Sequence, residues 1–183
     1  MTDDLAKPGP QDGAKARRTF SVQAIHLLRT VQLNTLQLSQ MADQKASILM
    51  GATLVVFTIS VGQASGGELP TSLAVLALFA FASALCAIIA VLPSTGGRRV
   101  KGDDPDGNML FFGHFTHNTE DEFTEMLLSR LSEDESLFRL IARDIYQNGQ
   151  VLRGRKYRFL GYAYRIFMVG ISITLIVFVA ESI

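Results

Sequence analysis

Three apolar stretches of membrane-spanning length constrain this chain more than any other feature. Residues 46–67 contain no charged side chain, and a second charge-free run covers residues 69–97. A third apolar run covers residues 159–180 and is interrupted only by Arg165. Each run provides about 20 apolar residues, which is the length that a helix needs to cross about 30 Å of hydrocarbon. We therefore predict three transmembrane helices, at residues 46–67, 71–92 and 159–180.

The composition agrees with an all-α integral membrane protein. Apolar residues make up 48% of the 183 positions and charged residues only 19%, which favours a membrane class over a soluble one. The formal net charge is zero, so nothing in the overall charge suggests a nucleic-acid partner; the bilayer is the expected partner. The single cysteine, Cys86, lies in the second apolar run and excludes an intramolecular disulfide and a cysteine-based metal site.

The distribution of Lys and Arg predicts the orientation. Six basic residues precede the first apolar run, whereas the connector at residues 62–70 has none. Basic residues also follow the second run and precede the third. Because cytoplasmic loops carry an excess of Lys and Arg, we expect a cytoplasmic N-terminus, a cytoplasmic segment 94–158 and a C-terminus on the other side. Arg165 either extends to the headgroups or lines a pore or helix contact.

The N-terminal region divides into a tail and a helix. Residues 1–19 contain several Pro and Gly residues without periodic apolar positions, which predicts a disordered tail. Residues 20–45 lack Pro and Gly and carry apolar residues at three- and four-residue steps, which predicts an amphipathic helix running into the first span. Its amides are Gln23, Gln32, Asn34, Gln37, Gln40 and Gln44. They either bridge neighbouring helices or form a solvated polar face.

Residues 94–158 are predicted to form a cytoplasmic helical region after a Gly- and Asp-rich start. Thr119 with Glu122 forms a capping-box pattern that begins one helix, and Ser132 with Glu135 repeats it for a second. The second helix is expected to end near residues 148–149, with an ion pair between Glu135 and Arg139 on its surface. Such a hairpin is too small for its own core, so it must pack on the N-terminal helix, on other copies or on the membrane.

No enzyme motif occurs in the sequence, and we expect a protein that is not an enzyme and has no cofactor. There is no phosphate-binding glycine loop, no zinc-ligand spacing and no nucleophile placed beside a His and a carboxylate. His114 and His117 are three residues apart, but a third metal ligand is not evident. A metal site is therefore not predicted.

Two short boxes remain unexplained by composition. The first stands directly before the first span and contains Asp43, Gln44, Lys45 and Ser47. It is either an interfacial anchor or, through Ser47 and Gly51, a close helix contact. The second contains Phe111, Phe112, Gly113, His114 and Phe115. It predicts a hydrophobic plug that docks the linker onto the bundle, with His114 hydrogen-bonded, and a ligand pocket is the alternative.

These boxes, in this order, resemble a known family. They are followed by Arg143-Asp144-Ile145-Tyr146, then by Leu152 and Lys156-Tyr157, and by a final span. The same order and membrane layout is typical of the Pycsar effector transmembrane family, the PycTM type, and the resemblance covers roughly residues 25–180. It implies a bacterial antiphage effector in the inner membrane. It also implies a partner pyrimidine nucleotide cyclase whose product, cyclic CMP or cyclic UMP, makes the effector impair that membrane.

The resemblance implies a nucleotide ligand but does not locate its site, because the sequence has no recognisable cyclic-nucleotide-binding β-barrel. Arginines of the predicted cytoplasmic segment are candidates for phosphate contacts, and its aromatic residues for stacking on the base. The candidates are Arg139, Arg143, Arg153 and Arg155 for the phosphate, and Phe111, Phe112 and Tyr146 for the base. The alternative function is a constitutive membrane scaffold or interaction subunit without permeabilising activity.

A homo-oligomer is expected from small residues in the second span. Ala80, Ser83, Ala84 and Ala87 share one helical face, and small residues let helices approach closely enough for packing to drive association. We predict that this face joins copies of the chain.

Overall fold

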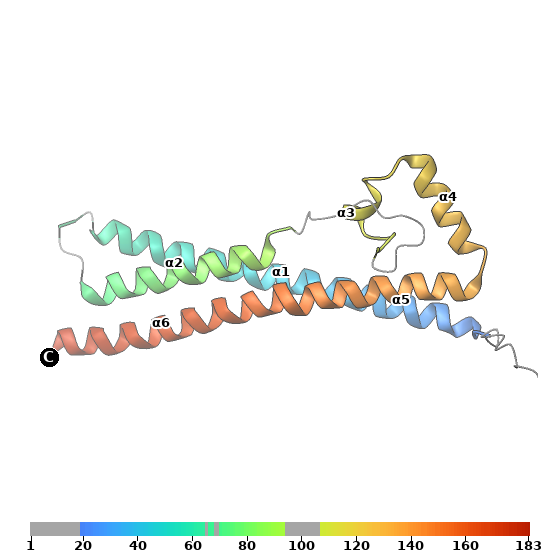
Figure 1. The fold of residues 1–183 in the computed structure, drawn as a ribbon. Helices are drawn as coiled ribbons and strands as arrows, with labels where there is room; N and C mark the ends of the chain where they lie inside the picture. The colour runs from blue at the N-terminus through green and yellow to red at the C-terminus, as the bar shows by residue number, and fades with distance from the viewer. Residues whose placement is uncertain (1–18, 65, 68–69, 94–106) are drawn as a thin grey trace, which may run out of the picture.

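The computed structural model describes residues 19–64, 66–67, 70–93 and 107–183 (Figure 1), and these residues are helical without a β-strand. The elements in chain order are α1 (Val22–Ala64), α2 (Thr71–Val91), α3 (Phe112–Phe115), α4 (Glu120–Leu131), α5 (Asp134–Val151), the π-helical segment η1 (Leu152–Tyr157) and α6 (Arg158–Ser182). The predicted disordered tail and most of the Gly- and Asp-rich linker lie outside the described residues.

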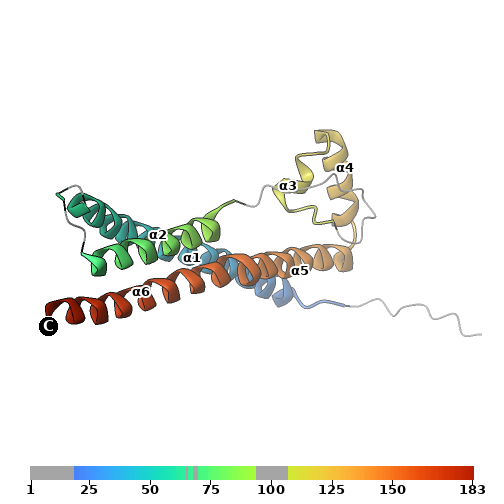
Figure 2. The same cartoon turned by 60° about the vertical axis from the view of Figure 1, so that its left-hand side comes forward.

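Three helices are long and apolar enough to cross a membrane, which confirms the predicted all-α fold class with three such helices; the cytoplasmic hairpin that was part of it stays a prediction. The three helices are α1, α2 and the continuous helix formed by α5, η1 and α6. As predicted, the amphipathic N-terminal segment and the first apolar run form one helix, since α1 extends over 43 residues. Figure 2 shows that α5 and α6 likewise lie along one rod. Two of the three membrane-competent helices therefore extend well beyond their apolar stretches.

The apolar parts of α1, α2 and α6 pack into a bundle whose core consists mainly of alanine. Ala42, Ala46, Ala87, Ala90 and Ala163 are almost fully buried together, with Leu49 and Leu160. Side chains this small allow the helix backbones to approach closely. In a bilayer such close packing drives helix association, because lipid tails are as apolar as the side chains and leave no hydrophobic driving force.

Two further contacts join α2 to α6. The Ser83 hydroxyl donates a hydrogen bond of 2.8 Å to the backbone oxygen of Ala163, and both residues are fully buried. Gly170 lies so close to Phe79 that a Cβ atom at the glycine would overlap the Phe79 side chain. At the end of the bundle, the Glu181 carboxylate accepts from the backbone N–H groups of Thr71 and Ser72, at 2.9 and 3.4 Å, and so caps the start of α2.

The small-residue face of α2 was expected to join copies of the chain, and the structure corrects this expectation. Ala80, Ser83 and Ala87 have no exposed surface within a single chain, and Ala84 is half-buried. The face is already occupied by the chain's own helices, as the hydrogen bond from Ser83 to α6 illustrates. The tight packing predicted for this face is therefore intramolecular.

Away from the bundle, α4 follows its predicted boundaries and α5 does not. The Thr119 hydroxyl accepts from the Glu122 N–H, and the Glu122 carboxylate accepts from the Thr119 N–H, which confirms the capping box. The second capping box, at Ser132, was wrong: the Ser132 hydroxyl donates to the Ser129 carbonyl at the end of α4 instead. Consequently α5 begins at Asp134 without a side-chain cap.

The α5 helix also continues past the residues where its end was predicted. It passes through Asn148 and Gly149 and leads through η1 into α6. The predicted Glu135–Arg139 ion pair is present at 2.5 Å. In both views α4 rises away from the axis of α5 (Figures 1 and 2), while α5 lies on α1, for example through the hydrogen bond from Gln32 to Asp144. Phe20, two residues before α1, packs against Phe138 of α5 with ring centroids 4.3 Å apart. Of the three supports considered for this region, the structure shows the N-terminal helix; packing on other copies or on the membrane stays a prediction.

Candidate functional site

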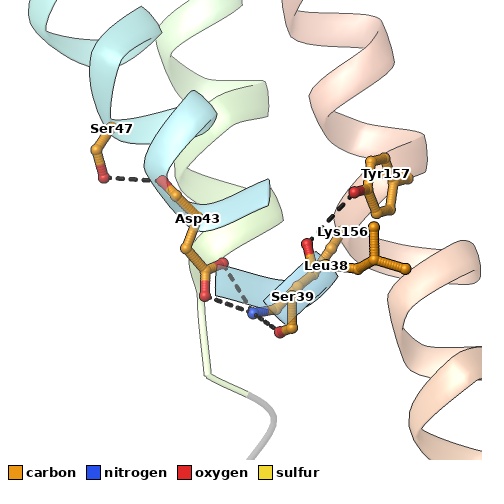
Figure 3. Close-up of polar contacts among 6 residues, drawn as sticks. All are labelled: Leu38, Ser39, Asp43, Ser47, Lys156 and Tyr157. Atoms are coloured by element: carbon orange, nitrogen blue, oxygen red, sulfur yellow. Dashed lines mark hydrogen bonds and ion pairs between the residues drawn. The ribbon is translucent and has the colours of Figure 1, made fainter. Parts of the chain in front are cut away.

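An ion pair joins α1 to the π-helical segment just outside the predicted spans (Figure 3). The Lys156 ammonium donates to both carboxylate oxygens of Asp43, at 2.8 and 2.6 Å, and to the Ser39 hydroxyl at 2.7 Å. The side chains are 20% exposed for Lys156 and 37% for Asp43. Because the pair is half-buried and all three Lys156 bonds go to α1, it fixes the position of α1 against the junction of α5 and α6.

The junction itself is a wide helical turn. Over Leu152–Tyr157 the chain is π-helical, a geometry that occurs mostly as short bulges and often at functional sites. Next to Lys156, the Tyr157 hydroxyl donates to the Leu38 carbonyl of α1 at 3.3 Å (Figure 3). Leu152, at the start of the segment, is buried.

A buried carboxylate organises the next contact along the two helices. Asp144 of α5 is only 5% exposed, and its oxygens accept from three side-chain amides. Asn108 and Gln32 donate at 2.9 Å each, and Asn148 donates at 3.0 Å. The network connects α1, α5 and the segment that precedes α3. It satisfies a buried charge with hydrogen bonds, as such a group requires.

Between these two polar clusters lies a groove with a volume of about 510 Å³. We call it the α1–α5 groove. Its wall residues on α1 are Arg29, Gln32, Leu33, Thr35, Leu36 and Ser39, and those on α5 and η1 are Asp144, Ile145, Asn148, Val151, Leu152 and Lys156. Apolar walls with a few convergent polar groups are typical of small-molecule sites.

The box before the first span serves helix packing and the ion pair. Ala42 and Ala46 enter the bundle core, and Asp43 binds Lys156. Gln44 and Lys45 are exposed. The Ser47 hydroxyl donates to the Asp43 carbonyl within the same helix (Figure 3). The close contact considered for Ser47 and Gly51 is not formed in the described residues, because both are exposed and nothing lies within 4 Å of a Cβ at Gly51.

The aromatic box is anchored around its histidine and glycine. His114 Nδ1 lies 3.2 Å from the Asn108 backbone nitrogen, so the predicted hydrogen bond of His114 is present. Gly113 is buried, and a Cβ there would overlap the Phe111 ring. Phe111 is half-buried, whereas Phe112 is 52% exposed. Two hydrogen bonds hold this segment on α5, from Asn108 to Asp144 and from Arg143 to the Gly107 carbonyl. No sequence pattern indicated the role of Asn108.

The predicted ligand residues are dispersed over the start of α3, α5 and η1. Arg139 pairs with Glu135 on the surface, and Arg143 donates to the Gly107 carbonyl at 3.2 Å. Arg153 is exposed, Arg155 is half-buried, and Tyr146 is 67% exposed. None of these five residues, nor Phe111 or Phe112, lines the α1–α5 groove. Their role as ligand contacts stays a prediction.

Sequence reasoning missed the residues that define the groove and its buried network, above all Arg29, Asn108 and Asn148. In the sequence, Gln32 was only one of several amides. In the structure it bridges to Asp144 of α5, whereas Gln23, Gln37, Gln40 and Gln44 are exposed. A signal was available in Asp144, an acid inside an otherwise amphipathic helix at a position facing the apolar stripe. Of its three hydrogen-bond partners, only Asn148 is close to it in the sequence.

Comparison with known protein families shows which family the chain belongs to. The family model PycTM, described as Pycsar effector protein domain, matches residues 26–181. The chain belongs to this family. The match includes both boxes, the α1–α5 groove and all three membrane-competent helices. Membership supports a role as an effector of Pycsar antiphage defence, functionally linked to a cyclase system, and together with the helices it indicates a membrane protein. Neither the curated proteins nor the solved structures provide a match.

Proposed function

We propose that this PycTM protein is a non-enzymatic effector that cyclic CMP or cyclic UMP activates and that then impairs the bacterial inner membrane. The nucleotide comes from the partner cyclase, and segment 94–158 faces the cytoplasm where that cyclase works. The family match supports the defence role. The excess of Lys and Arg beside segment 94–158 supports the orientation.

One observation carries the proposal: helices pass without a break from the aqueous part of the molecule into its apolar bundle. The 43 residues of α1 do so once, and the continuous helix of α5, η1 and α6 does so again. A ligand changes a two-state equilibrium only through different affinities for the two states. Because each rod is continuous, a change in how α1 meets α5 outside the membrane also changes how α1 meets α6 within it.

An exposed stripe on α1 supports self-association as part of the effector mechanism. It has three- and four-residue steps, the spacing of a coiled-coil seam, and copies in one membrane share an orientation, so their α1 helices meet in parallel. Asn34, Lys45 and Ala52 fill intervening positions of the same pattern. The large apolar members of this α1 stripe are Leu27, Val31, Leu38, Met41, Ile48, Val55 and Ile59, each between 37% and 64% exposed.

The part of this α1 stripe outside the predicted spans argues for a protein partner. Lipid covers Ile48, Val55 and Ile59 in a membrane, but Leu27, Val31 and Leu38 face water in a single chain. Burying them contributes roughly 25 cal/mol for each Å² of apolar surface removed from water. A second copy of α1 provides that cover along the full length of the stripe.

The experiment that tests the proposed function uses cells that produce the protein with and without a pyrimidine nucleotide cyclase. A membrane-potential dye reports the state of the inner membrane. We expect depolarisation only when the effector and the active cyclase are both present, and none with a catalytically inactive cyclase. An unchanged potential in all cells, with the effector inserted in the membrane, would favour the scaffold function instead.

A further inference from the structure

The α1–α5 groove lies outside the predicted spans, on the side of the bundle that holds the ion pair and the buried network. We infer that this groove is the binding site of the activating nucleotide, with the phosphate at Arg29 and the pyrimidine ring extending toward Ser39 and Lys156. This inference rests on the proposed function for the class of ligand. The position of the site rests on the volume, walls and charges of the groove.

The size and walls of the groove suit a mononucleotide. Its volume of about 510 Å³ lies within the range of about 300–1,000 Å³ that small-molecule sites have. Leu33, Leu36 and Val151 line it and are 59%, 56% and 46% exposed. These apolar side chains are exposed to solvent in a single chain. A planar ring packed against them removes that surface from water, which favours binding.

Charge places the phosphate at Arg29. Within the part of the chain that the structure describes, Arg29 has no carboxylate partner. The nearby Asp144 already accepts hydrogen bonds from three amides. A guanidinium binds phosphate oxygens through two parallel hydrogen bonds and keeps its charge at any physiological pH. The Arg29 end of the groove is therefore suited to a single anionic group.

The other end of the groove is suited to the base. Arg29 and Ser39 are separated by roughly 15 Å along α1, at about 1.5 Å per residue, so one phosphate cannot contact both ends. The Ser39 hydroxyl and the Lys156 ammonium are hydrogen-bond donors. They face the O2 carbonyl that cytosine and uracil share, so this contact admits either pyrimidine.

Binding at that end also provides a route to the membrane helices. Lys156 holds α1 through Asp43 and Ser39, and a base oxygen at the same donors competes with these bonds. The ligand then binds more tightly when α1 and η1 are separated than when Lys156 joins them. Such a difference in affinity is the condition for shifting the populations of the two states. The groove thus combines recognition with a change in the junction that enters the membrane.

The test measures binding of cyclic CMP and of cyclic UMP to the full-length protein in lipid nanodiscs by isothermal titration calorimetry. Arg29→Ala removes the phosphate contact, and Leu36→Trp fills the groove. Leu128→Trp on α4 is the matched control, because Leu128 is 55% exposed and does not line the groove. Circular dichroism and size-exclusion chromatography establish that each variant is folded, and mass photometry reports its oligomeric state.

We expect wild type and Leu128→Trp to bind at least one of the two nucleotides with equal affinity. Arg29→Ala should weaken binding about ten- to a hundredfold, and Leu36→Trp should abolish it. Wild-type affinity in both groove variants overturns the groove as the site while leaving the proposed function intact; if Leu36→Trp then also changes the oligomeric mass, a second copy occupies the groove. Absence of binding to wild type rejects the nucleotide as ligand, and the groove assignment with it.

Discussion

The Lys156 ammonium binds both carboxylate oxygens of Asp43, at 2.8 and 2.6 Å, although the two residues are 113 positions apart in the sequence. This pair connects the two long rods of the molecule at the point where each approaches the membrane. Two basic residues line the α1–α5 groove, Arg29 and Lys156. Among the described residues, only Lys156 of these two has a carboxylate partner. The junction of α1 and η1 is accordingly where the proposed nucleotide groove adjoins the membrane-competent helices.

Removing either partner of this pair should destabilise the protein. Lys156→Ala leaves the half-buried Asp43 carboxylate without its cation, and we expect a loss of about 1–2 kcal/mol in the free energy of unfolding. Asp43→Ala should cost a similar amount. The double variant should cost less than the sum, since the interaction is lost only once. Thermal unfolding in detergent micelles measures all three.

The control for the ion pair is Arg139→Ala. It breaks the Glu135–Arg139 pair, whose arginine side chain is 64% exposed, and exposed pairs contribute about 0.2–1 kcal/mol. Equal losses for Lys156→Ala and Arg139→Ala, or full additivity of the Asp43 and Lys156 changes, would contradict a structural role for the pair.

Gly170→Ala should disturb the packing of α6 on α2. A Cβ at Gly170 overlaps the Phe79 side chain at its own Cβ, so rotation of the ring cannot relieve the clash, and such overpacking costs about 1–3 kcal/mol. Gly51→Ala is the matched control, because nothing lies within 4 Å of the added atom. Protease resistance in membranes should fall for Gly170→Ala only; equal resistance of both variants would show that the helices do not pack this closely.

The exposed α1 stripe should carry contacts between copies. Val31→Gln combined with Leu38→Gln makes its aqueous part polar and should reduce the yield of crosslinked oligomer in membranes by several-fold, because the seam loses its apolar contacts. Leu128→Gln on α4 serves as the control at a similarly exposed leucine. Undiminished crosslinking of the double variant would indicate that another surface joins the copies.

The arginines chosen from the sequence can be compared directly with Arg29. If the phosphate lies in the α1–α5 groove, Arg29→Ala should raise the nucleotide concentration needed for toxicity about ten- to a hundredfold. Arg153→Ala, at an exposed position outside the groove, should leave the dose response unchanged. A shift for Arg153→Ala and Arg143→Ala but not for Arg29→Ala would return the phosphate site to α5 and η1.

Local sequence patterns were sufficient to predict the helices. The ends of the helices depended on which of several possible hydrogen bonds and packing contacts formed, and the sequence does not show this. The uncharged runs and the lack of Pro or Gly from residue 20 to 45 were sufficient for α1 and the spans. Ser132 matched a cap, but its hydroxyl satisfies the last turn of α4 instead. Gly149 matched a helix end, yet the cost of a glycine inside a helix is only about 1 kcal/mol, and the burial of Leu152 in the continued helix opposes that cost.

The site was less predictable because its contacts are distant in sequence. Asp144 meets Asn108 over 36 positions and Gln32 over 112, and no periodicity relates such residues. The glutamine-rich composition of α1 suggested bridging amides in general without distinguishing Gln32 from its exposed neighbours. Arg29 resembles any other charge on an amphipathic helix until α5 is placed beside it.

Dye release from liposomes that contain the purified protein tests the proposed function most directly. Cyclic CMP, cyclic UMP and, as a control, cyclic AMP are added in turn, and liposomes without protein are treated in parallel. We expect release of the enclosed dye only when the protein and a cyclic pyrimidine nucleotide are both present. Intact liposomes after addition of each pyrimidine nucleotide, with the protein inserted and folded, would contradict a nucleotide-activated effector that acts on the membrane.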